Sequence, residues 1–351
     1  MTKQVKVRNL LIGGGAPVTV QSMTNTPTAD VAATVAQIRA LEAAGCDIVR
    51  LAIPNEEAAL AIAQIREQTD MPLVADIHFD YRLALMCIER GIDKIRINPG
   101  NIGADENVRA VAVAARKAGI PIRIGINGGS LEKELLERYG HPCAEAMTES
   151  ALRQVKLLEQ ADFTDIVLSL KASSVPLTIE AYRRMSQLTD YPLHIGVTEA
   201  GTKWQGTLAA GIGIGTLLSE GIGDTLRVSL TDDPVEEVHT GIALLRLLEQ
   251  RKGLRFVSCP TCGRCQVDLV PIAQKIYEQI RTVDVPLHVA VMGCAVNGPG
   301  EAREADIGIA CGKGEALLFY HGEIAGKLPE DGLAEAFVER VLKLAEERKK
   351  L

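Results

Sequence analysis

Short apolar runs and amphipathic stretches take turns along roughly the first 250 residues, the size range of one large α/β barrel. Residues 28–44 place apolar side chains on one face of a predicted helix, and the continuous apolar run that follows predicts a strand. The same pair of patterns then recurs. The predicted strands cover residues 17–24, 47–53, 72–77, 94–98, 121–127, 165–171, 192–198 and 224–230.

Eight strands with helices between them are typical of a (β/α)8 barrel. An open, doubly wound sheet alternates in the same way, so the pattern alone leaves both architectures open. Beyond residue 250 cysteines cluster, and a helix at 267–281, a strand at 287–291 and a helix at 333–348 predict a compact α+β module. We therefore predict two domains, residues 1–253 and residues 254–351.

Charged and polar residues stand at the carboxyl ends of the predicted strands, where a barrel collects its catalytic groups. Four arginines and a lysine there favour a phosphate or diphosphate site, because guanidinium forks match phosphate oxygens. The alternative is that each arginine pairs with a neighbouring acid inside the barrel mouth. The residues at these ends are Arg50, Asp76, Arg96, Asn98, Arg123, Asn127, Lys171, Glu199 and Arg227, and His78 follows the third strand.

Three cysteines, Cys259, Cys262 and Cys265, lie within seven residues, and Cys294 follows in a Gly- and Pro-rich turn. Such spacing favours a metal or iron–sulfur site over packing, which is the role we expect for the scattered Cys46, Cys87 and Cys143. Structural zinc, a ferredoxin-type carrier and a 4Fe-4S cluster with one non-thiolate iron remain alternatives. Cys294 has no Cys-x-x-Cys partner for zinc, and Leu269 stands where a ferredoxin would have its fourth cysteine.

Composition narrows the class of protein further. The net charge of −7 argues against broad nucleic-acid binding, and no apolar run approaches the ~20 residues that span a bilayer. The amino terminus lacks a secretory signal, and the clustered thiols suit a reducing compartment, so we expect a cytoplasmic protein. The Gly-rich run at 211–215 lacks the setting of a dinucleotide fingerprint, and we expect it to serve close helix packing or a tight turn.

Several long motifs resemble the bacterial 4-hydroxy-3-methylbut-2-enyl diphosphate synthase family of the non-mevalonate isoprenoid pathway, over essentially the whole chain. They are VQSMTNT at 20–26, VADIHFD at 74–80, RINPGN at 96–101, GVTEAG at 196–201, SEGIGDTLRVS at 219–229, CPTC at 259–262 and GCAVNGPGE at 293–301. The chain lacks the domain that the longer family form inserts between barrel and cluster module. The resemblance implies a (β/α)8 barrel followed by a module similar to the cluster domain of sulfite and nitrite reductases.

The resemblance also implies a 4Fe-4S cluster, one per chain, held by three cysteines and a glutamate. Carried over by motif, these ligands are Cys259, Cys262, Cys294 and Glu301. Cys265 then becomes an extra thiol. Glu301 is a hard carboxylate on a soft cluster, so we expect it to exchange more readily than a thiolate and to take part in catalysis.

The implied reaction is a two-electron reductive dehydroxylation and ring opening of 2-C-methyl-D-erythritol 2,4-cyclodiphosphate, with reduced ferredoxin or flavodoxin as the electron donor. The implied assembly is a head-to-tail homodimer, in which the cluster domain of one chain caps the barrel of the other. Glu199, Asp76 and His78 are candidates for hydroxyl contacts or proton delivery. The expected substrate-binding residues are Arg50, Arg96, Asn98, Arg123, Lys171, Arg227, Ser229 and Asn297.

Two other classes of protein remain as alternatives. One is a non-redox phosphate-binding barrel enzyme, such as a pterin synthase-like transferase, with a structural zinc module. The other is an electron carrier or binding module without turnover. The metal content distinguishes the zinc-containing transferase from the implied reductase. Turnover of the cyclic diphosphate distinguishes the electron carrier from it.

Overall fold

The computed structural model of the protein describes residues 1–98 and 102–350. Pro99, Gly100 and Asn101, which end the RINPGN motif, lie outside the described residues. The chain divides into two compact units, Met1–Leu248 and Glu249–Leu351, and each has its own hydrophobic core. The boundary predicted between residues 253 and 254 stays a prediction.

The strands of the first unit are β1 (Val5–Val7), β2 (Leu10–Ile12), β3 (Thr19–Met23), β4 (Ile48–Ala52), β5 (Leu73–Ile77), β6 (Lys94–Ile97), β7 (Ile122–Asn127), β8 (Ile166–Lys171), β9 (His194–Ile195) and β10 (Thr225–Leu226). Its helices are α1 (Val31–Ala43), α2 (Glu56–Arg66), α3 (Tyr81–Glu89), α4 (Asp105–Ala118), α5 (Lys133–Tyr139), α6 (Ala144–Gln160), α7 (Val175–Leu188), α8 (Lys203–Ser219) and α9 (Pro234–Leu247). Local signals set the helix ends. For example, Asp30 caps α1 by accepting from Ala33 N–H, and Gly119 ends α4 with a φ of 67°.

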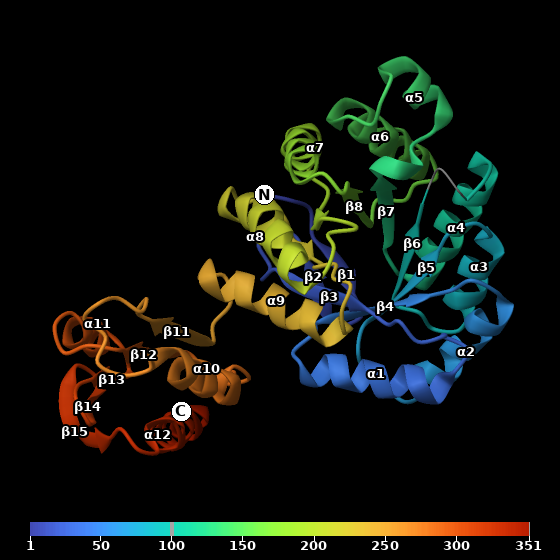
Figure 1. Cartoon of the computed structure of the whole chain (residues 1–351). Coiled ribbons are helices and arrows are strands. Elements are labelled where there is room, and N and C mark those ends of the chain that lie inside the picture. The colour runs from blue at the N-terminus through green and yellow to red at the C-terminus, as the bar shows by residue number, and fades with distance from the viewer. Residues whose placement is uncertain (99–101, 351) are drawn as a thin grey trace. The chain divides into compact units, whose positions relative to one another are not determined.

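Eight of these strands form one parallel sheet in the order β8-β7-β6-β5-β4-β3-β10-β9. A bridge between Leu168 of β8 and Leu193, just before β9, joins the two ends of that order. The sheet therefore closes on itself, and the helices lie outside it (Figure 1). The predicted (β/α)8 barrel is confirmed, and the open doubly wound sheet is excluded.

The amino-terminal hairpin is an element that the sequence patterns did not predict. Strands β1 and β2 pair antiparallel, and Val7 and Ile12 pack against Ile48 and Val74, near the amino ends of β4 and β5. An apolar plug thus covers that end of these strands. The carboxyl ends carry the polar residues of the predicted site.

The second unit is built on a five-stranded mixed sheet in the order β11-β12-β13-β14-β15, with the first three strands parallel and the last two antiparallel. Helices α10 and α12 cover one face through side chains such as Ile276 and Phe337, and α11 packs on the other face through Ala302. The predicted α+β module is confirmed. Its elements are β11 (Leu254–Ser258), α10 (Leu269–Ile280), β12 (Leu287–Met292), α11 (Gly298–Glu304), β13 (Ile307–Cys311), β14 (Glu315–Tyr320), β15 (Glu323–Pro329) and α12 (Leu333–Lys349).

The Gly-rich run and the scattered cysteines have clear packing roles in the structure. The Gly-rich run lies inside α8, and a Cβ on Gly213 would come within 2.7 Å of a Val197 methyl group, so close helix packing is its role. Cys46 and Cys87 are buried as expected, but Cys143 is only half-buried and caps α6, where its sulfur accepts from Ala146 N–H. No helix among residues 1–98 and 102–350 is long and apolar enough to cross a membrane.

Candidate functional site

An ion-pair cluster at the carboxyl ends of β4, β5 and β6 brings four predicted residues together. Asp76 lies in register with Arg96 on the next strand, and Arg96 Nη1 donates to Asp76 Oδ1 at 2.9 Å. Arg50 Nε lies 3.6 Å from the other Asp76 oxygen, and His78 Nε2 lies 3.2 Å from Arg96 Nη1. Burial raises the pKa of Asp76, but Arg50 and Arg96 outweigh burial and hold that pKa at about 2.

Two further predicted cations lie buried without a carboxylate of their own. Arg123 is in register with Arg96, donates from Nη1 to Gln21 Oε1 at 3.1 Å, and has no partner for Nε among the described residues. Lys171, the last residue of β8, is buried, and its side chain makes no hydrogen bond or ion pair within residues 1–98 and 102–350. Burial lowers the pKa of Lys171 well below its usual range, and Arg123 and Arg227 lower it further. An anion bound between these side chains would offset that repulsion.

Glycines on the inner face of the barrel make room for these long side chains. A Cβ on Gly125 would lie 2.6 Å from Arg96 Nε, and a Cβ on Gly196 would lie 2.7 Å from Lys171 Nζ. Any larger residue would therefore displace a charged group. Arg96 of β6 thus passes over Gly125 of the adjacent strand β7, and Lys171 of β8 passes over Gly196, which follows β9.

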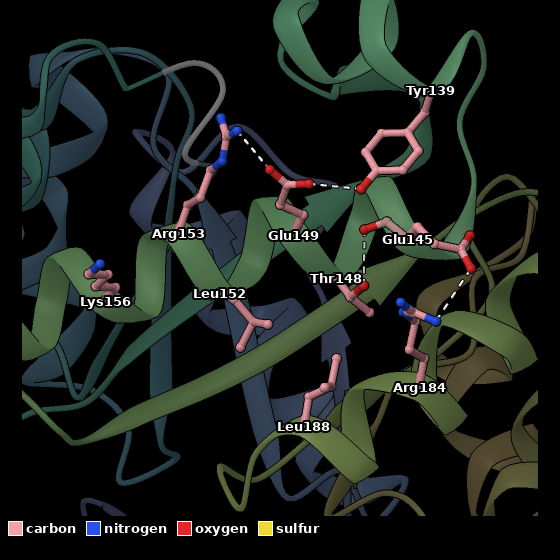
Figure 2. A pocket seen from close by; sticks show the side chains of 9 residues that line it. All are labelled: Tyr139, Glu145, Thr148, Glu149, Leu152, Arg153, Lys156, Arg184 and Leu188. Carbon is pink, nitrogen blue, oxygen red and sulfur yellow. Dashed lines mark hydrogen bonds and ion pairs between the residues drawn. The ribbon is translucent and has the colours of Figure 1, made fainter.

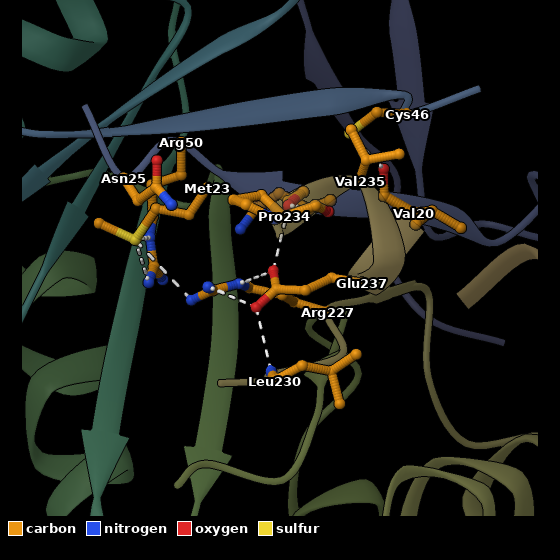
Figure 3. A network of polar contacts seen from close by, with 12 residues as sticks. Val20, Met23, Asn25, Cys46, Arg50, Arg227, Leu230, Pro234, Val235 and Glu237 are labelled. Atoms are coloured by element: carbon orange, nitrogen blue, oxygen red, sulfur yellow. Dashed lines mark hydrogen bonds and ion pairs between the residues drawn. The ribbon is translucent and has the colours of Figure 1, made fainter. Parts of the chain in front are cut away.

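Arg227 follows β10 and is held by a residue that the sequence patterns missed, Glu237 of α9. Figure 3 shows the two side chains in a fork, with Arg227 Nε and Nη2 each 3.1 Å from a Glu237 oxygen. Glu237 is only 4% exposed. An acid in the first turn of a helix is common on helix surfaces, so no sequence signal marked this one as buried.

The remaining barrel candidates lie near the same rim with fewer contacts. Asn98 is buried and donates from Nδ2 to Ser130 Oγ at 3.1 Å, while Ser229 is half-buried. Glu199 is exposed and has a φ of 53°, the left-handed region that costs a non-glycine residue conformational energy. Among the residues that the structure describes, no side-chain hydrogen bond of Glu199 identifies its role.

In the second unit, three cysteines stand at one edge of the sheet because β11, β12 and β13 are parallel. Cys259 follows β11, Cys294 follows β12, and Cys311 ends β13. Cys311 was not singled out from the sequence. It is fully buried, and burial raises the pKa of its thiol to about 12, so it is a neutral core residue.

The turn after β12 surrounds the predicted ligand sulfurs with backbone N–H groups. Gly293 N–H donates to Cys259 Sγ at 3.2 Å, and N–H groups of Asn297 and Val296 lower the pKa of Cys294. A Cβ on Gly293 would lie 2.5 Å from Cys265 Sγ, so only glycine fits there. Cys265 itself donates to Val267 O at 3.2 Å.

The other predicted residues of the second unit face solvent. Cys262, Asn297 and Glu301 are exposed, and Asn297 precedes α11 as its N-cap residue. No three His, Cys, Asp or Glu side chains within the described ranges converge as ligands of a single metal ion. A 4Fe-4S cluster places each of its ligands on a different iron, so its donors need not converge on one point. Three thiols and a carboxylate around a turn rich in N–H donors fit such a group.

A surface cavity of about 430 Å³ lies elsewhere on the first unit. Figure 2 shows it between the helices, with the Glu149 carboxylate bonded to Arg153 and to the Tyr139 hydroxyl. Its other lining residues come from α6 and α7, on the outside of the barrel. None of the predicted site residues lines this cavity.

Comparison with solved structures supports the barrel fold. A type I 3-dehydroquinate dehydratase from Clostridium difficile matches with a TM-score of 0.52 and 18% identity, over 71% of this chain and 98% of that one. The Yersinia pestis dihydropteroate synthase matches with a TM-score of 0.50 and 12% identity, over 71% of this chain and 100% of that one. At these identities the likeness concerns the fold alone.

Sequence comparison is far more specific. The 4-hydroxy-3-methylbut-2-en-1-yl diphosphate synthase (flavodoxin) of Geobacter sulfurreducens is 56% identical over 99% of both chains. The protein of that name from Clostridium perfringens is 58% identical over 96% of this chain and 97% of the relative. Residues 2–242 match the family model of the GcpE TIM-barrel domain, and residues 255–343 match that of the GcpE protein C-terminal domain. This chain belongs to the GcpE family and carries both of the family's domains.

Proposed function

We propose that this protein is an oxidoreductase of the non-mevalonate isoprenoid pathway, a 4-hydroxy-3-methylbut-2-en-1-yl diphosphate synthase. Its substrate is 2-C-methyl-D-erythritol 2,4-cyclodiphosphate. Two electrons enter, the ring C–O bond to phosphate and the C–O bond of the neighbouring hydroxyl break, and a carbon–carbon double bond forms. The hydroxyl leaves as water after it takes up a proton.

The balance of charge at the barrel rim is the observation that supports this proposal most strongly. Among the described rim residues, Arg50, Arg96, Arg123, Lys171 and Arg227 face only two buried carboxylates, Asp76 and Glu237. The excess positive charge lies in a buried setting, where charge–charge energies are larger than in water. An anionic diphosphate supplies the missing negative charge.

Each group of side chains has its own task in this proposal. Arg96 and Arg50 are held in place by Asp76, while Lys171 and Arg123 keep donors available for the phosphates. Asn98 and Ser229 contact the substrate from neighbouring strand ends, and Asn297 contacts it from the cysteine turn. His78 and Glu199 are the candidates for proton delivery, Asp76 stays ionised and contacts a hydroxyl, and Glu301 is the ligand expected to exchange most readily.

The cofactor in this proposal is a 4Fe-4S cluster, one per chain, which when bound supplies the electrons at low potential. Cys259, Cys262, Cys294 and Glu301 would hold it. Flavodoxin, the donor in the relatives' names, is the electron donor we propose for this chain. A head-to-tail homodimer is the proposed assembly, because a barrel's active rim and the exit of its last helix are at opposite ends.

Metal content tests the proposal against the alternative of a zinc-containing transferase. Protein purified without oxygen should be brown and contain about four iron and four sulfide per chain. Cys294→Ser should lose most of the iron, because it removes one ligand. Cys265→Ser is the matched control and should keep the iron, since that thiol already donates to Val267 O. Colourless wild-type protein that contains zinc and no iron would contradict the proposal.

A further inference from the structure

Glu237 is buried at the start of α9, and both of its oxygens are fully used. Oε2 accepts from Arg227 Nε and from Ser22 Oγ, each at 3.1 Å. Oε1 accepts from Arg227 Nη2 and from the Leu230 backbone N–H, also at 3.1 Å. This one carboxylate therefore joins β3, the segment after β10 and α9 (Figure 3).

The fork leaves one end of the guanidinium for other partners. Because Nε and Nη2 are taken, Arg227 presents Nη1, which lies 3.7 Å from Met23 Sδ. The same sulfur accepts from Arg50 Nε at 3.1 Å and from Arg50 Nη2 at 2.9 Å. A thioether is a weak, uncharged acceptor. The two guanidinium groups thus approach one thioether that adds no negative charge, so Glu237 and Asp76 are the carboxylates that pair with Arg227 and Arg50.

We propose that Glu237 is the positioning residue for Arg227, fixing the guanidinium so that its Nη1 faces the diphosphate beside Arg50. The inference rests on the proposed function, because it takes Arg227 to be a diphosphate ligand. Glu237 touches no substrate in this account. It acts by holding Arg227 in one orientation and by tying the Leu230 backbone to α9.

The sign of the effect separates positioning from plain electrostatics. A carboxylate next to an anion site repels the anion, so on charge alone the Glu237→Gln variant should bind the cyclic diphosphate more tightly. Positioning predicts weaker binding, because the amide accepts through one oxygen only and releases one arm of the fork. Glu237→Asp keeps the charge but shortens the reach, so positioning predicts weaker binding there too.

Calorimetric titration of the full-length protein with the cyclic diphosphate, without an electron donor, tests this. We expect Glu237→Gln and Arg227→Gln each to weaken binding about tenfold or more. In the Arg227→Gln background, adding Glu237→Gln should change the affinity less than twofold, because the partner it positions is gone. Glu236→Gln, on the same helix, is the matched control and should bind like the wild type.

Other outcomes separate the inference from the proposed function. Unchanged or tighter binding by Glu237→Gln, with Arg227→Gln weakened, would overturn the inference alone. Independent, multiplicative losses in the double variant would also overturn it. Absence of binding by the wild type would overturn the proposed function itself. If Glu237→Gln fails to fold, the Glu237→Asp titration decides in the same way.

Discussion

Asp76 and His78 stand two residues apart but have opposite protonation behaviour. Asp76 stays ionised at any working pH, since its pKa is held at about 2 despite burial. Burial lowers the pKa of His78 below its usual 6.5, Asp76 raises it, and Arg96 lowers it again. Asp76 is therefore a fixed anion that orients Arg96, and His78 is a neutral imidazole at neutral pH. Of this pair, Asp76 is fixed as an anion, and His78 is the one whose protonation can change, at a pKa below 6.5.

The lowered pKa of His78 predicts a pH effect on stability. Below about pH 6.5 the unfolded state binds a proton that the folded state accepts less readily, so stability falls as pH falls through that window. The His78→Gln variant lacks this contribution. As the pH is lowered from 7.5 to 5.5, the free energy of unfolding of this variant should therefore rise relative to that of the wild type. Denaturant unfolding at the two pH values measures the difference. A stability difference that is the same at both pH values would contradict the account.

Strand β6 carries two basic side chains, Lys94 and Arg96, that differ in their partners. Strand alternation points Lys94 and Arg96 to the same side, but only Arg96 has a carboxylate partner. Lys94 is fully buried, and its Nζ has no hydrogen-bond partner in the described part of the chain. Burial lowers its pKa well below the usual range, and Arg123 lowers it further. The lysine is therefore a cost to folding.

Replacing Lys94 by Met should stabilise the protein at pH 7 by about 1 to 3 kcal/mol, the cost of a buried polar group without a hydrogen bond. The unfolded lysine binds its proton up to about pH 10.4, so wild-type stability rises with pH below that value. The difference in free energy of unfolding between Lys94→Met and the wild type should therefore be smaller at pH 9.5 than at pH 7. The exposed Lys117→Met is the control, expected within about 0.5 kcal/mol of the wild type. A less stable Lys94→Met would contradict this and show that the Lys94 side chain has a stabilising partner.

Sequence patterns predicted the helices and strands well, but they predicted few of the side-chain contacts between elements that are distant in sequence. Apolar runs revealed all eight barrel strands, although β9 and β10 are regular over only two residues each. Strand ends identified Asp76 and Arg96, because parallel strands must bring their carboxyl ends together. Glu237 escaped notice, since its partners Ser22, Arg227 and Leu230 meet it only in the closed barrel. Spacing likewise gave no hint that Cys311 would end a strand beside Cys259 and Cys294.

At the scale of the whole molecule, two units divide the chemistry. The first unit supplies the cationic rim, and the second supplies thiols at the edge of a parallel sheet. Each has a complete hydrophobic core, so damage to one site should leave the other unit folded. The activity of a variant altered in one unit can therefore be compared with that of a variant altered in the other, in the same turnover assay.

The most direct measurement is anaerobic turnover of 2-C-methyl-D-erythritol 2,4-cyclodiphosphate with reduced flavodoxin, following 4-hydroxy-3-methylbut-2-enyl diphosphate as the product. The wild type should form it. Lys171→Met should lose at least about tenfold in kcat/KM while keeping its iron, since it removes a buried phosphate donor. Cys294→Ser should lose both iron and turnover, and an equimolar mixture of the two variants should recover activity through mixed dimers. No product from wild-type protein with its full iron content would contradict the account.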